Sequence, residues 1–146
     1  MNYKELINIA ESLFNSENDK ISLLANASAF LNEYIDDINW VGFYLDNGKE
    51  LVLGPFQGKV ACSVIPYNKG VCGHTYALNE TVVVDNVHDF EGHIACDSKT
   101  NSEVVIPLEN IGVLDFDSES FSRFDKPLVR FIEQVSQLLL KRLHEI

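Results

Sequence analysis

The sequence predicts an α+β fold: a central antiparallel sheet of about six strands, with helices on one face and a ligand pocket with a long loop on the other. Three observations predict this fold. Apolar residues recur at helical spacing near both ends of the chain, whereas the middle contains short runs of β-branched and aromatic residues. Short turns separate several of these runs, and such turns join antiparallel strands. The helices from the two ends would then cover one face of the sheet.

Helices are expected at both ends of the chain. The apolar positions of the first are Leu6, Ile9, Ala10, Leu13 and Phe14, and those of the second are Ile21, Leu24, Ala27, Ser28, Leu31 and Ile35. Asn18 or Asp19 is suited to cap the second helix, because a side-chain oxygen there accepts a hydrogen bond from a free backbone N–H. A last helix is expected after Asp125, with an inner face of Leu128, Phe131, Ile132, Val135, Leu138 and Leu139.

The period changes from helix to strand at Trp40, where a run of aromatic and β-branched residues begins. Asp46-Asn47-Gly48-Lys49 is typical of a hairpin turn after this first strand. A short helix is expected over residues 70–78. The six expected strands are residues 40–45, 51–53, 61–65, 81–84, 103–108 and 111–117.

Residues 85–102 have loop composition, rich in Asp, Asn, His, Gly and Ser. A loop of about 18 residues is long for a compact domain, and loops of this length are usually functional. Since the terminal helices occupy one face of the sheet, the loop and the short helix are left for the other face. The sequence therefore predicts a site between this loop and the open face.

Composition limits the classes of function. The chain has 146 residues and a net charge of −11, which suits one domain over residues 1–146 and argues against nucleic acid or an anionic membrane surface as a partner. No apolar run approaches the roughly 20 residues that span a bilayer, and the first residues lack the apolar segment of a signal peptide. A cytoplasmic location is therefore expected, where cysteines are more often catalytic or metal-binding than structural.

All three cysteines, Cys62, Cys72 and Cys96, lie in the middle third of the chain. They suggest a thiol redox site, with a metal site or a structural bridge as alternatives. Zinc is disfavoured, because structural zinc sites usually pair ligands two to four residues apart and this chain has no such pair. Cys96 lies in a loop where backbone N–H groups can stabilise a thiolate, although it could also be a loop cysteine without a role. Cys72 lies in an apolar stretch and is suited to a small core position.

Trp40 and Tyr44 are four residues apart on the first expected strand, so their side chains share one face of the sheet. Packing in the core would explain both residues. A tryptophan beside a tyrosine hydroxyl also suits the wall of a pocket that has one polar end.

Asp115 and Asp117 likewise share one face of the last expected strand, and Glu103 begins the strand before it. The three carboxylates are therefore expected to converge, unless they line a solvated edge. A converging acidic cluster binds an ammonium group, and mutual repulsion raises the pKa of one member, which keeps a proton available near neutral pH.

Six segments taken together resemble the free methionine-(R)-sulfoxide reductases, which are single GAF domains. The match covers roughly residues 20–142 and departs at Glu109-Asn110, where the family usually has several more residues. The segments are Asn39-Trp40-Val41-Gly42-Phe43-Tyr44, Leu53-Gly54-Pro55-Phe56-Gln57-Gly58-Lys59, Gly70-Val71-Cys72-Gly73, Gly92-His93-Ile94-Ala95-Cys96-Asp97, Ser102-Glu103-Val104-Val105-Ile106-Pro107 and Gly112-Val113-Leu114-Asp115-Phe116-Asp117-Ser118.

The resemblance implies reduction of free methionine (R)-sulfoxide, with thioredoxin as the reductant and without a metal or organic cofactor. It implies that Cys96 is the nucleophile, that Cys62 resolves it through a disulfide, and that Cys72 has a lesser or alternative redox role. The positions that match the substrate pocket of the family are Trp40, Tyr44, Glu103, Asp115 and Asp117. Within this set we assign proton donation to Asp117, because it lies at the strand end next to the loop that carries Cys96.

Two other functions are compatible with the residues: a non-catalytic GAF module that binds a small molecule, and an interaction domain that holds zinc. GAF domains often dimerise through their terminal helices, so a homodimer is the assembly that the resemblance suggests.

Overall fold

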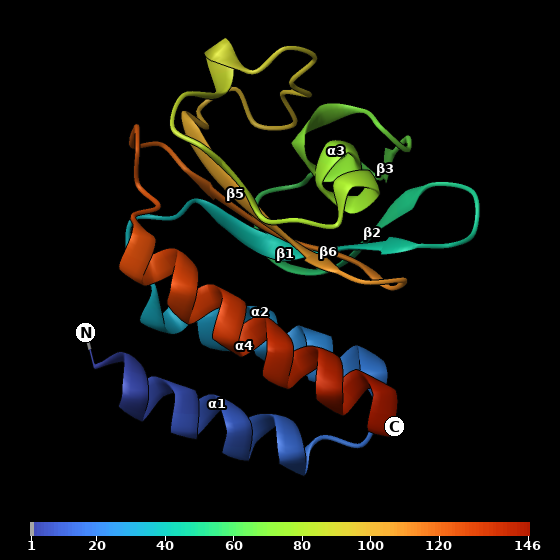
Figure 1. Ribbon diagram of the computed structural model, residues 1–146, viewed down its shortest axis with the longest axis vertical. Coiled ribbons are helices and arrows are strands. Elements are labelled where there is room, and N and C mark those ends of the chain that lie inside the picture. The colour runs from blue at the N-terminus through green and yellow to red at the C-terminus, as the bar shows by residue number, and fades with distance from the viewer. Residues whose placement is uncertain (1) are drawn as a thin grey trace.

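The computed structural model describes residues 2–146 and confirms the expected α+β architecture. Three helices from the ends of the chain lie on one side of the sheet, and a short helix and a long loop lie on the other (Figure 1). The helices are α1 (Tyr3–Ser16), α2 (Lys20–Tyr34), α3 (Gly70–Leu78) and α4 (Lys126–Glu145), with one 3-10 turn at Val87–Asp89. Within residues 2–146, no helix is both long and apolar enough to cross a bilayer.

The sheet has six strands in the order β3-β2-β1-β6-β5-β4, and all neighbouring strands are antiparallel. The strands are β1 (Trp40–Asp46), β2 (Leu51–Gly58), β3 (Val64–Ile65), β4 (Val82–Val84), β5 (Ser102–Leu108) and β6 (Gly112–Ser118). The central pair, β1 and β6, consists of segments more than sixty residues apart in the sequence, and their pairing places Trp40 opposite Asp117.

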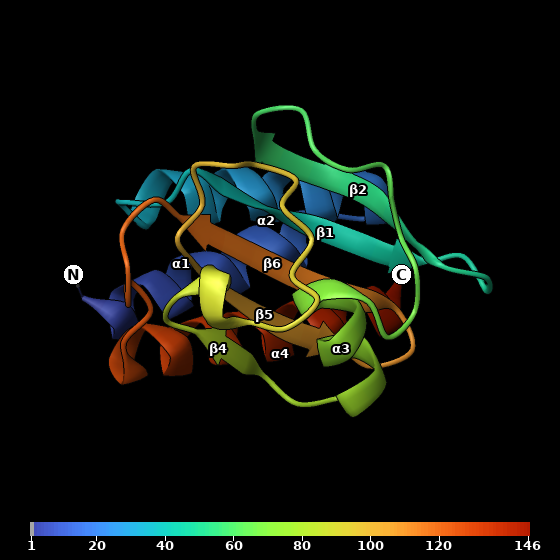
Figure 2. The ribbon, with the colours of Figure 1, turned by 90° about the horizontal axis from the view of Figure 1, so that it is seen from above.

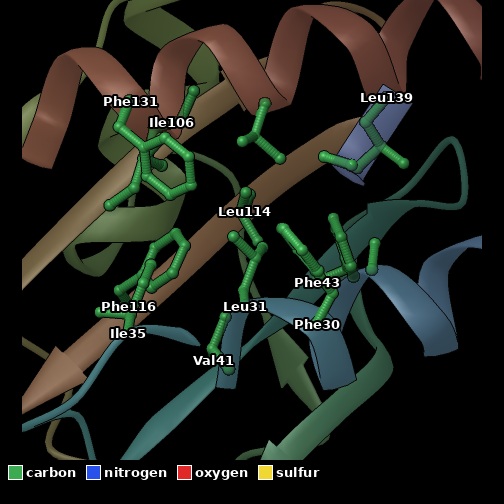
Figure 3. Packing of buried hydrophobic residues seen from close by; sticks show 14 of the residues in the cluster. Phe30, Leu31, Ile35, Val41, Phe43, Ile106, Leu114, Phe116, Phe131 and Leu139 are labelled. Carbon is green, nitrogen blue, oxygen red and sulfur yellow. The ribbon is translucent and has the colours of Figure 1, made fainter. Parts of the chain in front are cut away.

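Side chains along the central strands point alternately to the two faces of the sheet, so each face has its own set of residues. Val41 and Phe43 of β1, with Leu114 and Phe116 of β6, point toward α2 and α4 and form the larger core (Figure 3). The intervening side chains point to the opposite face, where Trp40 and Tyr44 belong to a second, smaller apolar cluster. Helices α2 and α4 pack on the sheet, and α1 packs on α4 and α2 from outside (Figure 1). The face opposite the helices is therefore left for a site.

Two strands differ clearly from their expected bounds, and two apolar side chains differ from their expected burial. Strand β2 is longer and continues through Pro55 to Gly58, whereas β3 is shorter than residues 61–65. Residues 61 and 62 lie outside the strand, and the Cys62 carbonyl accepts a hydrogen bond from the Tyr44 hydroxyl at 2.9 Å. The Ser63 carbonyl still accepts a hydrogen bond from Leu53 N of β2 at 2.9 Å. The exposed fractions of Ile9 (41%) and Ile21 (72%) place both outside the buried helix faces on which they were expected.

The hairpin between β5 and β6 is closed by a short turn at Glu109 and Asn110. Ile111 N donates to the Leu108 carbonyl at 2.9 Å, and Asn110 has a φ of 64°, a conformation that asparagine tolerates better than most residues. Strand pairing runs down to the Leu108–Gly112 pair. The residues missing relative to the family therefore belong to a turn at the far end of the hairpin from Glu103 and Asp117.

Asp125 caps α4, as expected from the sequence, and its Oδ1 accepts a hydrogen bond from Leu128 N at 3.0 Å. Replacing Asp125 by alanine should lower the free energy of unfolding by about 0.5–2 kcal/mol, because this N–H loses its partner. Asp125→Asn is the matched control and should have a much smaller effect, since asparagine caps as well as aspartate. Urea denaturation of the two variants measures the difference, and equal destabilisation by both would contradict a capping role.

Candidate functional site

A cavity lies on the face of the sheet opposite the terminal helices. It is lined by residues of the strands, of α3 and of the loop of residues 85–101. Figure 2 shows α3 and this loop on that face. Strands β1, β5 and β6 supply its floor, and Gly70 to Cys72 of α3 supply one wall. The loop crosses over the sheet in Figure 2, which brings Cys96 to the cavity. The structure thus brings together seven of the eight residues predicted for the site as cavity-lining residues: Trp40, Tyr44, Cys72, Cys96, Glu103, Asp115 and Asp117.

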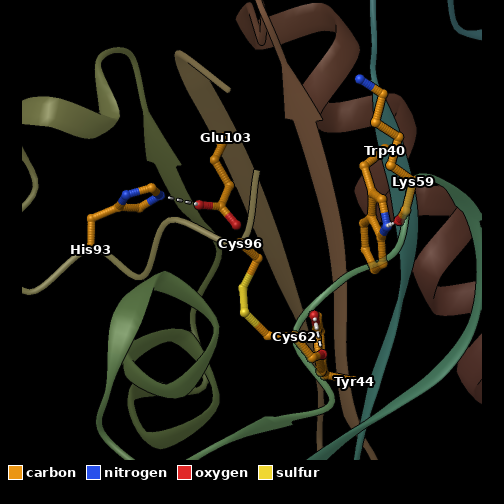
Figure 4. Close-up of a disulfide and its surroundings, with 7 residues drawn as sticks. All are labelled: Trp40, Tyr44, Lys59, Cys62, His93, Cys96 and Glu103. Carbon is orange, nitrogen blue, oxygen red and sulfur yellow. Dashed lines mark hydrogen bonds and ion pairs between the residues drawn. A yellow bond between two sulfur atoms is a disulfide. The ribbon is translucent and has the colours of Figure 1, made fainter. Parts of the chain in front are cut away.

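The eighth, Cys62, is joined to Cys96 by a disulfide (Figure 4). The bond connects residues 34 apart in the sequence, with their Cα atoms 5.5 Å apart, and both residues are half-buried. This is the pairing that the resemblance implied. Because Cys96 lines the cavity, the disulfide adjoins the space in which a ligand would bind.

The Trp40 and Tyr44 rings form an aromatic wall next to the disulfide (Figure 4). Their centroids are 5.8 Å apart and the rings are nearly parallel, and Phe56 stacks on Trp40 at 5.2 Å. Trp40 Nε1 donates to the Lys59 carbonyl at 3.2 Å, and the Tyr44 hydroxyl donates to the Cys62 carbonyl. These bonds satisfy both polar groups and tie residues 59–62 to the wall, which positions Cys62.

The three carboxyl groups converge as expected, since Glu103 and Asp117 are direct cross-strand partners and Asp115 is on the same face of β6. Glu103 (6% exposed) and Asp115 (4% exposed) are buried, and Asp117 is half-buried nearer the loop. Burial raises the pKa of each carboxyl group, and repulsion within the cluster raises it further. Without a bound cation, the cluster therefore holds protons at a pH at which ordinary carboxyl groups are ionised.

Asp115 Oδ1 is buried and has no hydrogen-bond partner among residues 2–146. A buried acceptor that lacks a partner costs free energy, and such groups at a cavity mark the place of a ligand donor. A positively charged donor suits this place best, because it would also relieve the repulsion among the three carboxyl groups.

Cys72 is buried in α3, as expected for a small core residue, but its sulfur also reaches the carboxyl groups of Glu103 and Asp115. Burial, followed by the charge of Asp115, raises the pKa of the Cys72 thiol well above its usual value. Cys72 is therefore a neutral thiol in the free protein, unsuited to attack.

Tyr76 of α3 makes a hydrogen bond to the end of β1. Its hydroxyl donates to Asp46 Oδ2 at 2.7 Å, and the Tyr67 hydroxyl donates to Asp46 Oδ1 at 2.5 Å. These bonds lower the pKa of Asp46 and raise the pKa of Tyr67 to about 12. Burial, followed by the bond to Asp46, raises the pKa of Tyr76 to about 12. The end of β1 thereby holds the helix that carries Cys72.

His93 and Asn39 also belong to the site, although the sequence did not predict a role for either. His93 Nε2 lies 3.6 Å from Glu103 Oε1, and burial lowers the pKa of His93, so a neutral imidazole faces the carboxyl group (Figure 4). Asn39 Nδ2 donates to Asp97 Oδ2 and to Thr100 Oγ1, both at 3.1 Å, and thereby anchors the loop on either side of residues 98–99. Both residues belong to segments that carry the family resemblance, and this membership was the available signal.

The comparisons with known proteins agree with this geometry. The GAF domain family model matches residues 11–143. The free methionine-R-sulfoxide reductase of Escherichia coli (strain K12) is 46% identical over 145 residues, which cover 94% of this chain and 88% of that protein.

Two solved structures are similar over nearly the whole chain. The reduced form of fRMsr of Staphylococcus aureus has a TM-score of 0.93 and 46% identity, covering 97% of this chain and 95% of that one. The free methionine-R-sulfoxide reductase of Neisseria meningitidis in complex with its substrate has a TM-score of 0.93 and 42% identity, and the match covers 97% of this chain and 88% of that one. The chain therefore belongs to the GAF domain family and, within it, to the free methionine-R-sulfoxide reductases.

Proposed function

We propose that this protein reduces free methionine (R)-sulfoxide to methionine and that its thiols supply the electrons. The observation that carries the proposal is the Cys62–Cys96 disulfide beside a cavity whose floor holds three buried carboxyl groups. A module that only binds a small molecule has no use for a redox pair at the ligand. The names of the relatives point to the same substrate.

The proposed reaction begins with the thiolate of Cys96, which attacks the sulfoxide sulfur while a carboxyl group protonates the sulfoxide oxygen. Methionine leaves, and the oxygen stays on Cys96 as a sulfenic acid. Cys62 then attacks the Cys96 sulfur, water leaves and the disulfide forms. Two electrons pass from the two thiols to the substrate in each turnover, and the structure corresponds to the oxidised product of this sequence.

Substrate recognition follows from the chemistry of the walls. The α-ammonium group of a free amino acid supplies the cationic donor that Asp115 Oδ1 lacks, and Glu103 lies beside it. The S-methyl group packs on the aromatic wall of Trp40 and Tyr44, between the carboxyl groups and the disulfide. A methionine sulfoxide residue inside a peptide has no ammonium group there, so we propose that the pocket rejects it.

The test is turnover with four substrates: the R and S epimers of free methionine sulfoxide and the same epimers inside a blocked peptide. Only the free R epimer should be reduced efficiently. Efficient reduction of the peptide substrate would refute the ammonium pocket, and absence of turnover with every substrate would refute the reductase assignment.

Replacing Glu103 by glutamine should raise KM for the free sulfoxide strongly and lower kcat less. The substitution keeps the shape but removes a negative charge from the ammonium end of the pocket. Steady-state kinetics over a wide substrate range measures the two effects separately. Glu119→Gln is the control, since Glu119 is exposed and does not line the cavity. A normal KM in Glu103→Gln would exclude Glu103 from ammonium binding.

We infer that thioredoxin is the reductant, because each turnover leaves a disulfide and the potential of thioredoxin is low enough to reduce it. A reducing compartment, the cytoplasm, suits this cycle.

We further propose that residues 1–146 act as one GAF domain without a metal or organic cofactor and that two copies associate through the terminal helices. Size-exclusion chromatography tests the last point.

A further inference from the structure

We propose that Cys72, Glu103 and Asp115 form a binding site for a divalent transition metal ion, with zinc as the best fit. One ligand atom of each residue, the Cys72 sulfur and one oxygen of each carboxyl group, lies within 4.8 Å of the other two. The three side chains come from α3, β5 and β6, so the fold holds them in place from three directions. All three are buried and line the cavity.

A second observation points to a cation. Asp115 Oδ1 is buried, has no hydrogen-bond partner and belongs to a cavity-lining residue. The cavity therefore contains a buried acceptor that a bound cation can satisfy. A metal ion satisfies it and neutralises its neighbours at the same time.

The sulfur decides which cation fits best. A thioether or thiol sulfur is a weak hydrogen-bond acceptor, so Cys72 adds little to an ammonium site. A thiolate is a strong ligand for zinc and a poor one for magnesium or calcium. Three protein ligands with a fourth position open to water is also the ligand number of catalytic zinc sites. On binding, the thiol proton passes to solvent, the metal–sulfur bond forms and no group changes its oxidation state.

The metal would occupy the position that we propose for the substrate ammonium group, so the two should exclude one another. This exclusion rests on the proposed function, whereas the metal site itself does not. Zinc would then act as an inhibitor that competes with the amino acid, and would do so without touching the Cys62–Cys96 pair.

The experiment uses two preparations in which Cys72 is the sole thiol: the oxidised protein, whose other cysteines form the disulfide, and the Cys62→Ser/Cys96→Ser variant. Cobalt(II) is the probe, because cobalt bound to a thiolate gives a charge-transfer band. Zinc should displace the cobalt from one site per chain. Free methionine (R)-sulfoxide, which cannot react with the double variant, should weaken cobalt binding to it.

Cys72→Ser in the oxidised protein should abolish the band and weaken zinc binding by at least the roughly 10–100-fold that loss of a ligand's hydrogen-bond partner costs. His74→Ala is the control: this histidine is exposed on the same helix, outside the cavity, and the band should remain. Absence of the band in both preparations, or its survival in Cys72→Ser, would overturn the site. A band that excess sulfoxide leaves unchanged would overturn the exclusion. Turnover measured separately with a metal chelator shows whether the reductase assignment itself holds.

Discussion

Cys96→Ser is expected to abolish sulfoxide reduction, including the single turnover that needs no added reductant. A serine hydroxyl is far less nucleophilic than a thiolate at neutral pH, so no sulfenic acid forms and no methionine leaves. The structure supports this choice of nucleophile, because Cys96 lines the cavity whereas Cys72 is held as a neutral thiol among carboxyl groups. The measurement is methionine released per chain after mixing reduced enzyme with substrate.

Cys62→Ser is the matched control, since it removes the other half of the same disulfide. It should still release one methionine per chain, because attack on the sulfoxide does not involve Cys62. Repeated turnover with thioredoxin should be lost or strongly slowed, since the disulfide that thioredoxin reduces cannot form. Release of one methionine per chain from Cys96→Ser would refute Cys96 as the nucleophile, and this result together with no release from Cys62→Ser would reverse the two roles.

The parts of the fold that sequence patterns predicted are those governed by local periodicity. Alternation along β6 placed Leu114 and Phe116 on one face and Asp115 and Asp117 on the other, and the structure confirms this division. Period-2 patterning is decisive here because one face packs on helices and the other lines a cavity. The cap at Asp125 is likewise a local hydrogen bond and was predictable.

The remaining features depend on contacts between distant segments. The side of α3 that faces the carboxyl groups could not be predicted, because the helix is short and apolar on most sides, so the contact of Cys72 with Asp115 was not foreseen. Strand β3 was expected too long, because Cys62 belongs to the disulfide and its carbonyl bonds to Tyr44 instead of a strand. The pairing of Cys62 with Cys96 followed from the family resemblance, since spacing alone left the partner open.

The second large effect on activity is expected from replacing the proposed proton donor, Asp117. Asp117→Asn should lower kcat by roughly 10²–10⁴, the usual contribution of general acid catalysis, while the substrate still binds. Asp117 is nearer the loop of Cys96 than Asp115 is: the charge of Asp97 in that loop contributes to the raised pKa of Asp117. The deeper Asp115 is suited to the ammonium group, so Asp115→Asn should raise KM more than it lowers kcat.

The pH dependence separates the two carboxyl groups further. Burial and neighbouring charge raise the pKa of Asp117, so the protonated donor persists to a higher pH than an ordinary aspartic acid and is lost as the pH rises through that raised value. The kcat of the wild type should therefore fall on the alkaline side, and Asp117→Asn should lack this limb because asparagine does not titrate. The two aspartates titrate as a coupled pair, so the limb belongs to the cluster, and Asp115→Asn should shift it to lower pH by removing a repelling charge. If Asp115→Asn is instead inactive at saturating substrate and Asp117→Asn only raises KM, the two roles are exchanged.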